Sequence, residues 1–137
     1  MSGHIDTVTV PEWPAPKGYS NGMVARGRTL FIAGQVGWNE RGEFETDDLV
    51  LQLGKALDNV LAVVRAAGGS PADVVRMTIY VTDLDAYRDN LRPVGRAWKD
   101  RFGKHFPAMA LVGVTGLVER RAKVEVEATA VLPEAAA

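Results

Sequence analysis

The chain has 137 residues, of which 47% are hydrophobic and 24% are charged, and its formal net charge is −1. That length supports one domain with its own core, spanning residues 1–137, and is short for two. The 16 basic and 17 acidic residues nearly cancel, which argues against nucleic acid as a partner. The chain contains no cysteine, so disulfides, thiolate chemistry and cysteine-bound zinc are excluded.

The sequence also gives no reason to expect a metal, a cofactor or a membrane. His4 and His105 lie far apart and lack the helical spacing of paired metal ligands. The N-terminus is polar and lacks the apolar segment of a signal peptide. No apolar run is long enough to cross a bilayer. We therefore expect a cytoplasmic protein without metal or cofactor.

The first third of the chain is predicted to form short strands and turns. Residues 8–10 are a candidate edge strand, and the prolines that follow favour an extended loop. Residues 23–26 and 29–33 flank Gly27 and Arg28, and this pattern predicts a β-hairpin.

Two segments further along show the apolar spacing of amphipathic helices. Residues 47–67 repeat apolar side chains at helical intervals and stop at Gly68, a residue type that commonly ends helices. Residues 83–102 show the same spacing, and Pro93 is expected to kink this helix or to delay its start. Between them, residues 74–81 are apolar and β-branched, which predicts a buried strand.

The C-terminal part is predicted to hold two more strands. Residues 106–117 look like a strand entered through Pro107, and the short charged segment after them favours a hairpin to residues 123–132. In the last segment valine alternates with Glu125 and Glu127, which indicates a half-buried strand with both carboxylates on one face. A carboxylate pair of this kind usually faces water, and it gains interest only where another subunit covers that face.

The order of these elements is β-β-β-α-β-α-β-β. It predicts an α/β fold with a mixed sheet of about six strands and two helices on one face. The other face of such a sheet would remain an exposed apolar patch, so we expect an oligomer.

Four segments, taken in order, resemble the Rid family of reactive intermediate deaminases, also called the L-PSP endoribonuclease or translation initiation inhibitor family. They are KGYSNGM, LFIAGQVG, LDNVLAVVRAAGGSPADVVRMTIYVTDLDAYR, and FPA with the later VEVEATA. The resemblance covers nearly the whole chain. It implies the chorismate-mutase-like (RidA-like) α/β fold, assembled as a homotrimer with clefts for a small molecule between subunits.

The chemistry that the resemblance implies is hydrolysis of enamines and imines to 2-keto acids and ammonia. In the family an arginine binds the substrate carboxylate and a glutamate on the last strand positions water. The matching glutamate here is Glu125. Residues that match cleft-lining positions are Tyr19, Ala33, Gly34, Gln35, Arg92, Met109 and Leu111. Arg92 stands where the family has an asparagine, and Asn90 lies close by.

The departures from the family pattern fall in the implied cleft. Met109 stands at the position of the arginine, Ala33 at that of a serine, and Leu111 at that of a small or polar residue. Methionine and leucine offer an apolar wall and cannot bind a carboxylate. By analogy with interface pairs, losing a desolvated arginine–carboxylate pair costs roughly 2–5 kcal/mol. The resemblance therefore implies an atypical substrate.

Three functions stay open on the sequence. The first is an imine or enamine deaminase with this altered cleft. The second is a non-catalytic trimer that binds or senses a small ligand. The third is an endoribonuclease, which the neutral charge and the lack of a histidine and lysine cluster disfavour. Glu127 is expected to form an ion pair at the subunit interface, and His105 to be a surface residue that is also a weak acid–base candidate.

Overall fold

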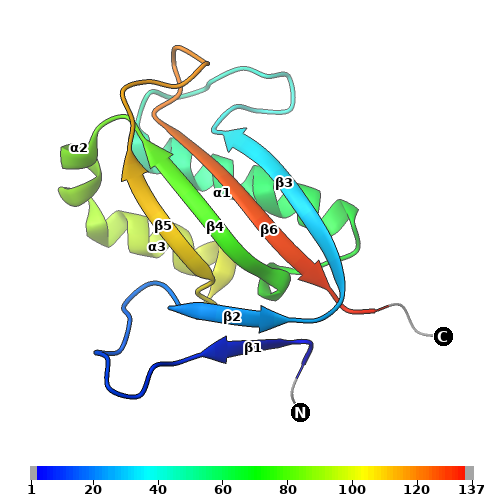
Figure 1. Cartoon of the computed structure of the whole chain (residues 1–137). Helices are drawn as coiled ribbons and strands as arrows, with labels where there is room; N and C mark the ends of the chain where they lie inside the picture. Colours follow the sequence, from blue (N-terminus) through cyan, green and yellow to red (C-terminus); the bar gives the residue numbers. More distant parts are fainter. Residues whose placement is uncertain (1–2, 135–137) are drawn as a thin grey trace.

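The computed structural model describes residues 3–134 and confirms the α/β class (Figure 1). Its elements are β1 (Ile5–Val8), β2 (Gly22–Ala25), β3 (Arg28–Val36), α1 (Leu49–Ala66), a 3₁₀ turn (Pro71–Asp73), β4 (Val74–Val81), α2 (Leu84–Arg88), α3 (Leu91–Phe102), β5 (Ala108–Gly113) and β6 (Val124–Leu132). Six strands form, as expected, but they are divided between two sheets.

The larger sheet has four strands in the order β3-β6-β4-β5. Strand β6 runs antiparallel to both of its neighbours, whereas β4 and β5 are parallel. Strands β1 and β2 form a separate antiparallel ribbon, which crosses below one end of the large sheet in Figure 1. The sheet is therefore mixed, as the element order predicted.

The predicted hairpin between β2 and β3 is wrong, because the chain turns a corner there and enters the other sheet. Gly27 makes the corner at a φ of 149°, a backbone conformation that side chains rarely allow. Any β-carbon at this position would collide with the backbone carbonyl of Leu132 at the end of β6. The corner thus depends on glycine packing directly against β6.

The predicted hairpin between β5 and β6 is also wrong. Residues 114–123 carry the chain from the sheet edge over the end of β4, so that β6 lies between β3 and β4 (Figure 1). The half-buried pattern of β6 is confirmed: Val124 and Val126 are fully buried, and the glutamates between the apolar positions are half-buried.

All three helices lie on one face of the large sheet. Helix α1 begins at the Asp48 cap, whose side chain accepts a hydrogen bond of 2.9 Å from Leu51 N. The predicted helix over residues 83–102 is two helices, α2 and α3, with a break at Asp89 and Asn90. Pro93 falls in the first turn of α3, where its missing N–H removes no intrahelical bond.

The opposite face of the large sheet is uncovered in the single chain. Register places Phe31 of β3 beside Thr129 of β6, and Val112 of β5 beside Tyr80 of β4. Phe31 is 80% exposed, which is unusual for a phenylalanine in the middle of a strand. Within residues 3–134, no helix is long and apolar enough to cross a membrane.

Candidate functional site

The uncovered sheet face carries Glu125 beside an irregular stretch of β3. The ladder between β3 and β6 shifts register between Ile32 and Gln35, so Ala33 and Gly34 bulge and are exposed. The Glu125 carboxylate lies against Gly34, where any β-carbon would collide with Oε2. Glycine therefore makes room for the carboxylate, and Gln35 Nε2 closes the bulge by donating to the Ala33 carbonyl at 3.1 Å.

Glu127 lies on the same face and has a hydrogen-bond partner within its own chain. The Tyr80 hydroxyl donates to Glu127 Oε1 at 2.5 Å, within the same chain. This hydrogen bond is the main cause that raises the pKa of the Tyr80 phenol above its ordinary value. The Glu127 carboxylate is thus hydrogen-bonded to Tyr80, whereas the Glu125 carboxylate lies next to a glycine.

The helix face of the sheet holds a pocket of about 590 Å³. Met109 and Leu111 reach it because they pair with Met77 and Ile79, which belong to the core under the helices. Its lining consists of Lys17, Gly18, Tyr19, Leu53, Ile79, Tyr87, Leu91, Val94, Gly95, Trp98, Lys99, Gly103, Lys104, Phe106, Met109, Ala110 and Leu111. The lining comes from the loop before β2, from α2 and α3, from the loop after α3, and from β5, with one residue each from α1 and β4.

Aromatic side chains form much of the pocket wall. Trp98 stacks on Phe106 with ring centroids 6.1 Å apart. Burial raises the pKa of the Tyr87 phenol. His105 lies just outside the lining, and its Nε2 is 2.7 Å from the Val74 carbonyl oxygen. This contact anchors the loop after α3 to the start of β4, so the imidazole serves the fold.

The expected site residues fall into two groups on opposite faces of the sheet. Tyr19, Met109 and Leu111 lie in the pocket, while Ala33, Gly34 and Gln35 lie near Glu125. Successive side chains of a strand point to opposite faces, so Met109 and Glu125 cannot meet within one chain. Arg92 is exposed on α3 and joins neither group. The Asn90 side chain donates to the Ala86 carbonyl at 2.7 Å.

Sequence reasoning missed the part of the pocket that α2 and α3 contribute. Leu91, Val94 and Trp98 follow one another at helical spacing, which by itself predicts an ordinary core stripe. Lys99 and Lys104 gave no signal, because lysines near the end of a helix are common. Among residues 3–134, no three histidine, aspartate or glutamate side chains gather as a metal site requires.

These features define an α/β domain with a largely apolar pocket under its helices and a carboxylate on its open sheet face. The family model described as Endoribonuclease L-PSP matches residues 11–132. The chain therefore belongs to this family, whose members include the Rid proteins.

Two relatives named 2-iminobutanoate/2-iminopropanoate deaminase are similar over most of the chain. The one from Escherichia coli is 34% identical over 134 residues, covering 96% of this chain and 98% of the relative. The one from Dermatophagoides farinae is 31% identical over 126 residues, covering 91% and 94%. A solved Rid-family protein of unknown function from Yersinia pestis superposes with a TM-score of 0.84 at 35% identity, covering 95% of this chain and all of the other.

Proposed function

We propose that this protein is a hydrolase that deaminates imines and enamines in a site shared between neighbouring copies of the chain. The observation that carries the proposal is the Glu125 carboxylate, which lies against Gly34 on a sheet face that the single chain leaves open. Family membership and the two relatives named as deaminases support it.

The two halves of the proposed site belong to different copies. One half is the pocket with Tyr19, Met109 and Leu111, and the other is the open face with Gly34 and Glu125. In a closed ring, each copy presents one surface to a different surface of the next copy. The homotrimer implied by the resemblance would thus bring Glu125 of one copy to the pocket mouth of its neighbour.

In such a cleft the reaction adds water to the carbon of a C=N bond and releases ammonia. Glu125 is the proposed general base, which accepts a proton as the water oxygen bonds to that carbon. Two protons pass from the water oxygen to the nitrogen through Glu125. The nitrogen then leaves as ammonia, a carbonyl remains, and the carboxylate is restored.

The test is ammonia release from a panel of 2-imino acids that an amino acid oxidase generates in situ. Glu125→Gln keeps the side-chain shape and removes the base, so kcat should fall by roughly 10²–10⁴-fold. Glu127→Gln is the matched control and should lose much less, because Glu127 binds Tyr80. Both variants should keep the assembly of the unmodified protein.

Equal losses from both variants would mean that the assignment of the two carboxylates is wrong. Full activity of Glu125→Gln would remove the proposed base and leave non-catalytic ligand binding as the better account of the pocket.

A further inference from the structure

The pocket combines an apolar interior with a cationic mouth. Its interior is formed by aliphatic and aromatic side chains, among them Met109, Leu111 and Trp98. Every charged side chain among the described residues that line it is a lysine: Lys17, Lys99 and Lys104. An apolar cavity with one sign of charge at its opening suits a ligand with an apolar body and an anionic end.

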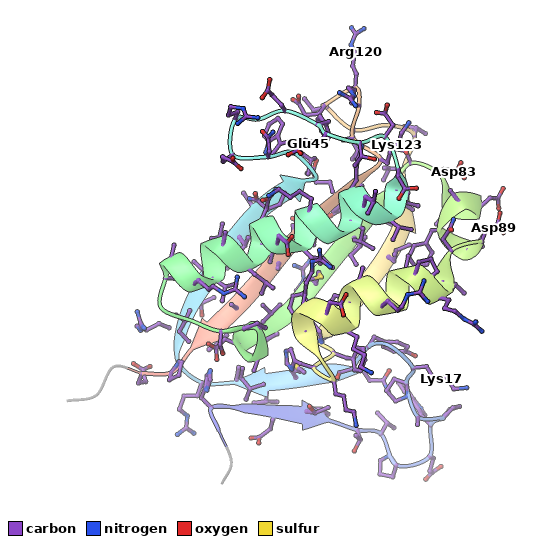
Figure 2. All side chains as sticks on the ribbon, turned by 180° about the vertical axis from the view of Figure 1, so that it is seen from behind. Lys17, Glu45, Asp83, Asp89, Arg120 and Lys123 are labelled. Atoms are coloured by element: carbon purple, nitrogen blue, oxygen red, sulfur yellow. The ribbon has the colours of Figure 1, made fainter. Side chains whose placement is uncertain are left out.

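The lysines come from separate elements, so they are not a run of charge in the sequence. Lys17 lies on the loop before β2, which passes below α3 in Figure 2. Lys99 lies in the last turn of α3, and Lys104 follows the end of that helix at Gly103. All three ammonium groups are on exposed residues, as expected for side chains that surround an opening.

We propose that this pocket binds 2-oxo and 2-imino acids with a branched aliphatic or aromatic side chain, and that it disfavours the smallest members of the class. The carboxylate is held at the mouth by the lysines, and the apolar side chain extends toward Met109 and Leu111. This inference deepens the proposed function, since the ligand would be the substrate or product of that reaction. Binding itself requires no turnover.

The volume and the chemistry of the walls decide the direction of selectivity. A cavity of about 590 Å³ lies within the range of about 300–1,000 Å³ for pockets that hold drug-sized ligands, and pyruvate would fill little of it. Each buried CH₂ group strengthens binding by roughly fourfold. 4-Methyl-2-oxopentanoate has three more carbon atoms than pyruvate, so it should bind roughly tenfold to sixtyfold more tightly.

The first experiment titrates the assembled protein with stable 2-oxo acids by calorimetry. 4-Methyl-2-oxopentanoate should bind at least about tenfold more tightly than pyruvate, and its methyl ester should bind more weakly than the acid. The ¹³C-methyl NMR signal of Met109 should shift on binding. The signal of Met77, which is fully buried on the same side of the sheet, is the reference. Equal affinity for both acids, or a shift that omits Met109, would overturn the proposal.

The second experiment tests the cationic mouth with matched changes of charge. Lys17→Gln and Lys104→Gln should each weaken binding of 4-methyl-2-oxopentanoate by roughly twofold to fivefold, and added salt should reduce this difference. Arg65→Gln removes the same charge from the exposed end of α1, away from the pocket, and should leave affinity unchanged. Equal losses of affinity in all three variants would overturn the role of the lysines, because they would show that only the net charge of the protein affects binding.

The two proposals fail in distinguishable ways. Selective binding without ammonia release would contradict the proposed hydrolase and leave the ligand class standing. Rapid hydrolysis of 2-iminopropanoate, with no preference for larger acids in binding or in turnover, would contradict the ligand class and leave the hydrolase standing.

Discussion

Glu125 and Glu127 share one face of β6, yet their neighbours give them different chemistry. Glu127 accepts a short hydrogen bond from the Tyr80 hydroxyl, which fixes its carboxylate. Glu125 lies against Gly34, a position that has no side chain to compete for it. A carboxylate that keeps free acceptor capacity can bind a water, so Glu125 is the better candidate for the base.

The Tyr80–Glu127 pair should be visible in a spectroscopic titration of the tyrosines. Because hydrogen bonding to Glu127 raises the pKa of Tyr80 above 10.0, Glu127→Gln should lower that pKa toward the ordinary value. Absorbance of the phenolate reports the change, and Tyr80→Phe assigns the signal. Glu119→Gln, in an exposed loop, is the control and should leave the titration unchanged.

The sign of the linked stability effect follows from the raised pKa. A tyrosine that holds its proton more tightly in the folded state adds stability that is fully present below the pKa of the unfolded chain. That stability is lost as pH rises through the folded pKa. Unfolding experiments should therefore show a loss of stability above about pH 10 that is smaller in Tyr80→Phe. An identical pH profile in both proteins would contradict this coupling.

Met109 in the pocket wall predicts weak activity on the smallest imino acid. Its thioether offers no charge to a carboxylate. The smallest substrate should therefore bind more weakly, by roughly 2–5 kcal/mol, than it would to a site with arginine at this position. Hydrolysis of 2-iminopropanoate, measured as pyruvate release from enzymatically generated 2-aminoacrylate, should be weak or absent. A rate equal to that of a relative with arginine at this position would contradict the expectation and point to another cation.

At the scale of elements, α1 is tied to two long loops through one buried glutamine. Gln52 is fully buried. Its Nε2 donates to the carbonyls of Thr46 and Arg121 at 2.9 and 3.0 Å, and its Oε1 accepts from Lys123 N at 2.7 Å. The side chain thus satisfies backbone groups in the loop before α1 and in the loop before β6, and it fixes the entry into β6, the strand that carries Glu125.

Replacing this glutamine should therefore cost much of the stability of the domain. Gln52→Leu keeps the volume and leaves up to three backbone groups without a partner, so the free energy of unfolding should fall by roughly 2–5 kcal/mol. Urea denaturation measures the loss. Leu51→Ala, next to it and 63% exposed, should change stability by no more than about 0.5 kcal/mol. Similar losses in both variants would refute this role of Gln52.

At the scale of the whole molecule, the main feature is the large sheet with helices on one face only. The open face exposes Phe31 of β3 and Val112 of β5, and it is the same face that carries Glu125. An apolar strand face left open in a domain of this size indicates an interface. A homotrimer that uses this face remains a prediction, and it is the assembly that the proposed shared site requires.

A charge on this face should therefore disrupt the assembly. Burying a phenylalanine side chain contributes roughly 1.5–3 kcal/mol, and Phe31→Glu replaces this gain with the cost of burying a carboxylate. Sedimentation velocity should find three times the mass of one chain for the unmodified protein and smaller species for the variant. Val118→Glu changes an apolar residue that is even more exposed than Phe31, in the loop before β6, and should leave the trimer intact. A monomeric unmodified protein would contradict the prediction.

The sequence by itself determined most of the segments that form helices and strands, and the family to which they belong. The first strand is an exception, because β1 covers Ile5–Val8 and not the expected residues 8–10. The apolar spacing of α1 and the valine–glutamate alternation of β6 are local patterns, because side-chain periodicity follows from backbone geometry alone. The break between α2 and α3 was only half anticipated. Pro93 marked the place, but the helix restarts just before it, in a first turn that accepts proline.

Strand partners and the composition of the site were decided only by the tertiary structure. Both predicted hairpins failed, because pairing depends on long-range contacts such as Gly27 against the end of β6. Strand pairing also placed Met109 and Glu125 on opposite faces of the sheet, an arrangement that the resemblance, with its clefts between subunits, had left open. Lys17 lines the same pocket as Lys99 and Lys104, although more than half of the chain separates it from them. No local pattern encodes such a meeting, since it arises only when the loop before β2 packs beside α3.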